Sequence, residues 1–158
     1  MINLLLSKSG VQDSSIVLDV GCGIGGTSRH LSSAHGCTVT GITISPKQVE
    51  LANRLTNSEA SPDTKDNESF TPLGEGKVRF LELDAENMAS HFAAQSGTFD
   101  VVWISEALSH FPNKALFFEN AKRVLKEGGK LVLADWFKDE GLSEAAFEAD
   151  IKPIEGMH

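Results

Sequence analysis

Apolar residues along this chain fall into two patterns, short continuous runs and stripes at helical spacing. The runs predict strands at residues 15–20, 37–44, 78–83, 99–104 and 130–134. The unbroken run from Val101 to Ile104 is typical of a central strand buried on both faces. The stripes predict helices at residues 2–9, 25–35, 46–55, 85–95, 114–126 and 142–151. This alternation predicts an α/β fold, a parallel sheet with helices on both faces.

Local signals mark several element boundaries. We expect Gly36 to stop the second helix, because glycine accepts the left-handed conformation that often follows a helix. Ser45 is expected to cap the third helix, with Pro46 at its first position. We expect Gly128 and Gly129 to end the helix that precedes the last strand.

One segment lacks either pattern, and length and composition complete the outline. Residues 56–76 are largely polar without a period, so we interpret them as a flexible surface insertion. The length of 158 residues indicates a single domain over residues 1–158. An apolar fraction of 41% and a charged fraction of 23% are typical of a globular protein.

Charge and cysteine content narrow the classes of partner and the compartment. The net charge is −8 without a run of Lys or Arg, which disfavours binding to nucleic acid or to an anionic membrane surface. No apolar stretch approaches the ~20 residues of a membrane span. Neither a secretory signal nor metal-ligand spacing is recognisable. Cys22 and Cys37 are interpreted as reduced thiols of a cytoplasmic protein.

A glycine-rich turn follows the first strand and carries the strongest functional signal. It contains Gly21, Gly23, Gly25 and Gly26 and leads directly into a helix. Glycines let a ligand approach the backbone closely, and the N–H groups at a helix start attract negative groups. The spacing fits the dinucleotide pattern G-x-G-x-x-G and also D-x-G-x-G-x-G starting at Asp19. A nucleotide-type cofactor is therefore expected, and a turn without a ligand is the plainer alternative.

The end of the second strand helps to choose between cofactors. A nicotinamide enzyme needs an acidic residue there for the ribose hydroxyls. The segment 41–45 has no acid, and the first one, Glu50, lies inside the next helix. This weakens the interpretation as a nicotinamide oxidoreductase, which we keep as the least favoured hypothesis.

Four segments in order carry a family resemblance. They are VLDVGCGIGG (17–26), GITISPKQ (41–48), LDAENM (83–88) and VLKEGGKLVLAD (124–135). With them the chain resembles class I S-adenosylmethionine-dependent methyltransferases, closest to the tocopherol- and sterol-type small-molecule enzymes and the cyclopropane fatty acid synthases. The resemblance implies a Rossmann-like doubly wound parallel sheet with strand order 3-2-1-4-5, lacking the family's last two strands.

The resemblance also implies a set of cofactor-binding residues. Asp19 would serve the ammonium end of the cofactor, Thr43 and Gln48 its ribose, and Asp84 its adenine amino group. The full expected set is Asp19, Gly21, Cys22, Gly23, Gly25, Thr43, Ile44, Gln48, Asp84, Ala85 and Ser105. Simpler alternatives are an Asp19 that only bonds the loop, a solvated Gln48 and an Asp84 that only caps its turn.

The segment after the fourth strand supplies the candidate catalytic residues. Residues 103–114 are similar to the W-S-M-E-x-x-E-H-M-P-D-K stretch of tocopherol-type enzymes, with Glu106 and His110 matching and Ser109 replacing the second acid. His110 is the candidate general base, because histidine ordinarily titrates near neutrality. Trp136 is expected either to wall the substrate pocket or to lie in the core.

These residues lead to two main functional hypotheses. The first is methyl transfer from S-adenosylmethionine to a lipid-like or secondary-metabolite acceptor. The second is a truncated binding module without independent turnover, favoured by the missing strands. The strand at 130–134 would then be an apolar sheet edge, which we expect to be covered by the C-terminal segment or by another subunit, for example in a homo-oligomer.

Overall fold

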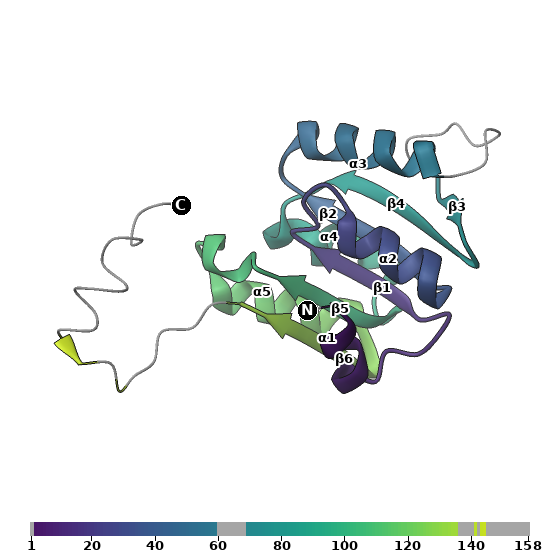
Figure 1. The fold of residues 1–158 in the computed structure, drawn as a ribbon. Coiled ribbons are helices and arrows are strands. Elements are labelled where there is room, and N and C mark those ends of the chain that lie inside the picture. The colour runs from purple at the N-terminus through teal and green to yellow at the C-terminus, as the bar shows by residue number, and fades with distance from the viewer. Residues whose placement is uncertain (1, 60–68, 136–140, 142, 145–158) are drawn as a thin grey trace.

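The computed structural model describes residues 2–59, 69–135, 141 and 143–144. One sheet crosses the molecule in the order β3-β4-β2-β1-β5-β6 (Figure 1). The strands are β1 Ile16–Val20, β2 Thr38–Thr43, β3 Thr71–Leu73, β4 Gly76–Glu82, β5 Phe99–Ser105 and β6 Leu125–Ala134. Neighbouring strands are parallel except β3 and β4, which are antiparallel. The predicted order 3-2-1-4-5 is confirmed as β4-β2-β1-β5-β6.

Helices cover both faces of the sheet (Figure 1). They are α1 Ile2–Ser9, α2 Gly26–His35, α3 Pro46–Glu59, α4 Met88–His91 and α5 Lys114–Val124, with short 3-10 turns at η1 Ala85–Asn87, η2 Ala93–Gln95 and η3 Leu108–His110. Gly36 ends α2 as predicted, with φ 62° and its N–H donating to Leu31 and Ser32 carbonyls. The Ser45 hydroxyl accepts from the Gln48 N–H at 3.4 Å at the start of α3.

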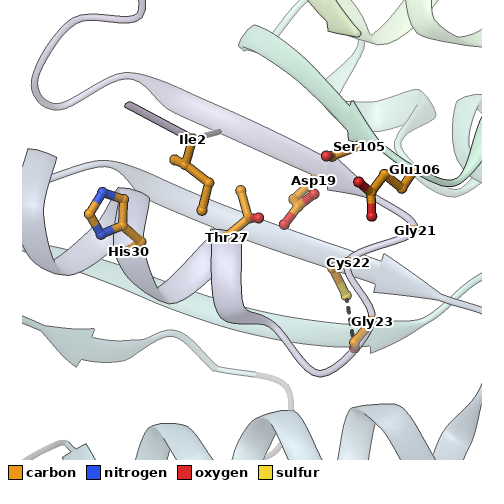
Figure 2. Close-up of a pocket in the computed structure, with 9 residues that line it drawn as sticks. All are labelled: Ile2, Asp19, Gly21, Cys22, Gly23, Thr27, His30, Ser105 and Glu106. Carbon is orange, nitrogen blue, oxygen red and sulfur yellow. Dashed lines mark hydrogen bonds between the residues drawn. The ribbon is translucent and has the colours of Figure 1, made fainter. Parts of the chain in front are cut away.

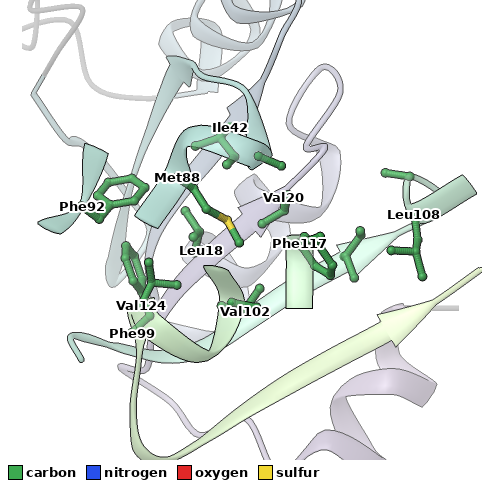
Figure 3. Packing of buried hydrophobic residues seen from close by; sticks show 14 residues of the cluster. Leu18, Val20, Ile42, Met88, Phe92, Phe99, Val102, Leu108, Phe117 and Val124 are labelled. Atoms are coloured by element: carbon green, nitrogen blue, oxygen red, sulfur yellow. The ribbon is translucent and has the colours of Figure 1, made fainter. Parts of the chain in front are cut away.

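The sheet separates two apolar cores. One lies beneath α4 and α5, where Leu18, Val102 and Phe117 are fully buried (Figure 3). The other lies beneath α2 and α3 and includes Leu31 and Trp103. Because β1 and β5 have apolar residues on both faces, they form the rigid centre from which the glycine turn emerges.

The boundary between α5 and β6 differs from the prediction. The helix ends at Val124, and Gly128 and Gly129 lie inside β6 rather than at the helix end. Pairing with β5 prevails over helix propensity here, with Leu125 opposite Phe99 and a register shift before Lys130. An ion pair between Lys126 and Asp100 of β5 strengthens this pairing.

Two further segments refine the predictions. The region 56–76 is structured at both ends, because residues 56–59 complete α3 and residues 71–73 form β3, while residues 60–68 lie outside the described residues. The helix predicted at 85–95 is divided into η1, α4 and η2. Trp136 and most of the helix predicted at 142–151 are also outside the described residues. Within the described ranges, no helix is long and apolar enough to cross a membrane.

Candidate functional site

The candidate site lies at the carboxyl ends of β1, β2, β4 and β5. The glycine turn leaves β1 there and is tied to β2, since the N–H groups of Gly21 and Cys22 both donate to the Ile42 carbonyl at 3.0 Å. A further bond from the Gly25 N–H to the Cys22 carbonyl, 2.9 Å, closes the turn. The backbone of this loop is therefore held in place by the sheet.

Two glycines show why the turn needs residues without side chains. Gly21 has φ 71°, and a Cβ on it would lie 2.5 Å from the Ala107 Cβ, so it permits close packing against the loop after β5. Gly23 has φ 55°, and a Cβ there would meet nothing within 4 Å. Gly23 thus faces open space and leaves room for a ligand.

Two cavities flank this turn. The first measures about 540 Å³ and is lined by Ile2, Asp19, Gly21, Cys22, Gly23, Thr27, His30, Ser105 and Glu106 (Figure 2). The second measures about 510 Å³ and is lined by Val20, Gly21, Gly23, Ile42, Thr43, Ile44, Gln48, Leu83, Asp84, Ala85, Glu106, Ala107, His110, Phe111 and Pro112. Both cavities share Gly21, Gly23 and Glu106, so an elongated ligand can pass over the turn from one to the other.

Asp19 is the buried charged group of the first cavity. It is 3% exposed, and the Ser28 hydroxyl of α2 donates to its Oδ2 at 2.5 Å. Burial raises the pKa of Asp19 to about 6, while the bond from Ser28 acts to lower it. A cationic ligand group in this cavity would favour the ionised carboxylate.

Cys22 contributes shape rather than reactivity. Burial raises the pKa of the Cys22 thiol well above its ordinary value, and the charge of Asp19 raises it further. The side chain lies beside Gly23 (Figure 2), with Sγ 3.7 Å from the Gly23 carbonyl. A neutral thiol therefore occupies the crowded base of the turn.

Thr43 and Gln48 form a preorganised polar pair in the second cavity. Thr43 Oγ1 donates to Gln48 Oε1 at 2.6 Å, although Gln48 belongs to α3. Thr43 is only 7% exposed, whereas Ile44 beside it is 71% exposed. Gln48 is consequently held at the wall of the second cavity by Thr43.

The Asp84 turn forms the far end of the second cavity. Asp84 Oδ1 accepts from the Glu86 N–H at 2.9 Å, so it caps the turn as the simpler alternative proposed. Asp84 also lines the cavity, and capping occupies one of its two oxygens. Asn120 of α5 supports this turn from below, donating to the Glu86 carbonyl at 2.8 Å and the Ala85 carbonyl at 3.3 Å.

The two candidate catalytic residues lie on one loop. Glu106 follows β5 directly, has φ 55° and lines both cavities, whereas His110 lies in η3 and lines the second. Both side chains are exposed. Ser105 reaches the first cavity beside Asp19 (Figure 2).

Comparison with known proteins identifies the family. The profile of a family described as "Methyltransferase domain" matches residues 18–133. The chain belongs to this methyltransferase domain family. The family predicted from the four sequence segments is therefore confirmed.

Two relatives and one solved structure are similar to this methyltransferase domain. A 2-methyl-6-phytyl-1,4-hydroquinone methyltransferase of Synechocystis sp. is 48% identical over 120 residues, covering 76% of this chain and 31% of that protein. A chloroplastic tocopherol O-methyltransferase of Arabidopsis thaliana is 36% identical over 120 residues, covering 76% and 30%. Haemonchus contortus phosphoethanolamine N-methyltransferase 2 in complex with S-adenosyl-L-methionine has a TM-score of 0.69 at 25% identity, covering 94% and 31%. The domain thus spans about a third of the length of these proteins.

Several residues of the methyltransferase domain site were not predicted from the sequence. Thr27 and His30 of α2 line the first cavity, and Ser28 holds Asp19. Asn120 lies on the buried face of α5 and Asp135 follows β6. Asn120 carried a detectable signal, because a polar residue within an apolar helical stripe needs a hydrogen-bond partner.

Proposed function

We propose that this methyltransferase domain binds S-adenosylmethionine across the two cavities and transfers its methyl group to a small-molecule acceptor. The observation that carries the proposal is the continuity of the cavities over Gly21 and Gly23, with a buried carboxylate on one side and a polar pair on the other. No other described feature combines these properties. The names of the relatives support an acceptor of the hydroquinone or phenol class.

The described side chains fit the chemistry of that cofactor. Asp19 would bind the ammonium end, and Gly23 would leave space for the chain that joins the two ends. Thr43 and Gln48 would bond the ribose hydroxyls, since the Gln48 amide nitrogen still has donors to offer. Asp84 and the Ala85 N–H would recognise the adenine, with Ile44 as an apolar cover. When bound, S-adenosylmethionine supplies an electrophilic methyl group on a positively charged sulfur.

We assign separate tasks to the loop after β5. Glu106 would orient the acceptor, because it lines both cavities, and a ring nitrogen of His110 would take the proton from an acceptor hydroxyl.

The variant His110→Gln is expected to lower kcat about 100-fold or more without changing cofactor affinity. His91→Gln in α4 is the matched control and should retain activity. Equal kcat values for His110→Gln and wild type would exclude the general-base role.

Two experiments test the function itself. Titration calorimetry should show binding of S-adenosylmethionine and no comparable binding of NAD, whereas the opposite result would favour the nicotinamide hypothesis. Incubation with methyl-labelled S-adenosylmethionine and a panel of prenylated hydroquinones, phenols and sterols should then transfer label to one class. The panel also distinguishes oxygen from carbon as the acceptor atom, through analysis of the labelled product.

A binding module without independent turnover is the second candidate. The observation that favours it is the matched length, because this chain matches only about a third of the length of the two relatives. Cofactor binding in calorimetry together with no labelled product from any acceptor class would select this candidate. Transfer of label by the chain alone would exclude it.

We also propose that the edge strand β6 is covered, either by the segment that follows it or by a second subunit. Among the described strands β6 pairs only with β5, and an unpaired strand edge promotes association. Light scattering combined with hydrogen exchange tests this. A monomer whose β6 amides exchange freely would contradict the proposal.

We propose a reducing compartment such as the cytoplasm for this domain. The support is that Cys22 and Cys37 are both free thiols. Fractionation of the source cells, with detection of the native protein, tests this compartment. Recovery in an oxidising compartment would contradict it.

A further inference from the structure

The carboxyl end of β6 and the residue after it bind the loop that carries both candidate catalytic residues. The Glu106 N–H donates to the Ala134 carbonyl at 2.7 Å. Asp135 Oδ2 accepts from the Leu108 N–H at 2.8 Å and from the Ser109 N–H at 3.3 Å. Three main-chain donors of this loop are therefore bound by two consecutive residues, Ala134 at the end of β6 and Asp135 directly after it.

The loop depends on this external support. Glu106 has φ 55°, a strained conformation for a residue other than glycine, which persists only where the surrounding structure holds it. The turn η3 has only three residues, and its first flanking residue, Ala107, offers no side-chain cap. Asp135 takes the role of that missing cap from a distance of 27 residues in the sequence. A carboxylate makes stronger bonds to N–H groups than a neutral acceptor.

The position of this loop determines the shape of the site. Ala107 packs against Gly21, where a Cβ would be 2.5 Å away, and both residues line the second cavity. Glu106 directly precedes Ala107, His110 follows it by three residues, and both line the same cavity. A shift of η3 would thus move both candidate catalytic side chains relative to the glycine turn. Thr43, Gln48 and Asp84 belong to other elements and would stay in place.

We propose that Asp135 is a positioning residue of the methyl-transfer site, whose carboxylate fixes η3 and thereby the places of Glu106 and His110. This inference rests on the proposed function. It assigns Asp135 an effect on kcat rather than on cofactor binding, because its contacts are to the catalytic loop. It also distinguishes Asp135 from Asp19, whose expected effect is on the cofactor.

Amide hydrogen exchange followed by NMR tests the contact directly in the protein without ligands. In Asp135→Ala, exchange at Leu108 and Ser109 should accelerate about tenfold or more, because each N–H loses a charged acceptor. Asp135→Asn keeps an acceptor oxygen and should retain most of the protection. Asp100→Ala is the matched control. It also removes a carboxylate acceptor of a main-chain bond, 2.8 Å from the Ile16 N–H, but at the amino ends of β1 and β5, away from the candidate site. Its Leu108 and Ser109 amides should exchange as in wild type.

Kinetics and binding complete the test. With an acceptor identified from the panel above, Asp135→Ala should lower kcat about tenfold or more, Asp135→Asn should restore much of it, and Asp100→Ala should leave it near wild type. Cofactor affinity should change less than about twofold in all three, because the cofactor residues are untouched. Parallel losses of affinity and kcat in Asp135→Ala would reduce Asp135 to a general structural role and overturn the inference.

The two levels of proposal fail in different ways. Unchanged amide exchange in Asp135→Ala overturns the positioning role even where wild-type protein binds S-adenosylmethionine. Absence of cofactor binding by the wild type overturns the proposed function, and with it the catalytic meaning of the contact, whatever the exchange rates show. If Asp135→Ala does not fold, Asp135→Asn decides, because a loss of kcat of about tenfold with amides protected as in wild type would contradict positioning through this bond.

Discussion

At the scale of single residues, the buried carboxylate of Asp19 is expected to lower the stability of the fold while it favours binding of a cationic ligand. Its side chain is 3% exposed, and burial raises its pKa to about 6. Near neutral pH it is therefore ionised inside the protein, at a cost in free energy that an apolar or amide side chain would not carry. A buried charge that is retained at such a cost is expected to have a ligand of opposite charge.

The variant Asp19→Asn tests this opposition through its pH dependence. The pKa of Asp19 is raised from 3.8 to about 6, so its contribution to stability is fully present below pH 3.8 and is lost as pH rises through 6. At pH 7 the variant should be more stable than wild type by roughly 1–3 kcal/mol, and the gain should vanish near pH 4. Urea unfolding at several pH values measures this difference.

Binding should change in the opposite direction. We expect Asp19→Asn to weaken S-adenosylmethionine binding about tenfold or more at pH 7, since a charged hydrogen bond is lost. Wild-type affinity should also fall between pH 7 and pH 5 as Asp19 becomes protonated. A variant that gains stability and keeps its affinity would show that Asp19 does not bind the cofactor.

Gly23 offers a matched pair of substitutions. Gly23→Ala and Gly128→Ala both place a Cβ where φ is positive, 55° and 76°, and where nothing lies within 4 Å. Each should lower the free energy of unfolding by about 1–2 kcal/mol. Only Gly23→Ala should abolish cofactor binding in calorimetry, because its Cβ would occupy the ligand space. Equal affinities of the two variants would place the ligand elsewhere.

At the scale of elements, α5 supports the site from the side of the sheet opposite α2. Its buried face presents Phe117, Asn120, Ala121 and Val124, at the spacing of an apolar stripe. Asn120 is the polar member, and it donates to both carbonyls of the Asp84 turn. One helix thus packs the core with three residues and fixes the Asp84 turn at the second cavity with the fourth.

Substitutions on this face should separate packing from positioning. Asn120→Leu leaves two carbonyls without their donor and should lower stability by about 1–3 kcal/mol. Val124→Ala on the same face should cost a similar amount through a cavity. Only Asn120→Leu should also weaken cofactor binding, by about fivefold or more, because the Asp84 turn loses its support. Calorimetry on the two variants measures the difference, and equal affinities would restrict Asn120 to a packing role.

The elements also show what sequence can and cannot predict. Apolar runs located β1, β2 and β5, which are buried almost throughout, and also the cores of β4 and β6. Motif order placed Thr43 and Asp84 at strand ends and Gln48 in the helix that follows β2. The apolar pattern missed β3, whose three residues pair only with β4, and the early start of β6 at Leu125. Both are decided by pairing between distant segments. Ser28 and Asp135 escaped prediction for the same reason, since their partners lie 9 and 26–27 residues away.

At the scale of the whole molecule, the site is a property of the assembled sheet. Its residues lie at or beyond the carboxyl ends of β1, β2, β4 and β5, and helices α2 and α3 add further lining residues. The parallel register brings Asp19 of β1 opposite Gly41 and Trp103. No single described element contains both Asp19 of the first cavity and Asp84 of the second. A ligand that spans both cavities can therefore bind only the folded domain, and it should stabilise the whole sheet cooperatively.

This coupling leads to a prediction for thermal unfolding. At a concentration of S-adenosylmethionine 100 times its Kd, mass action should raise the free energy of unfolding by about 2.7 kcal/mol. For a domain of this size the midpoint should rise by roughly 5–10 °C. Gly23→Ala should show no shift, while Gly128→Ala should melt lower but shift as wild type does. NAD at equal concentration should have no effect. A shift caused by NAD alone, or one that persists in Gly23→Ala, would mean that the ligand does not lie over the glycine turn.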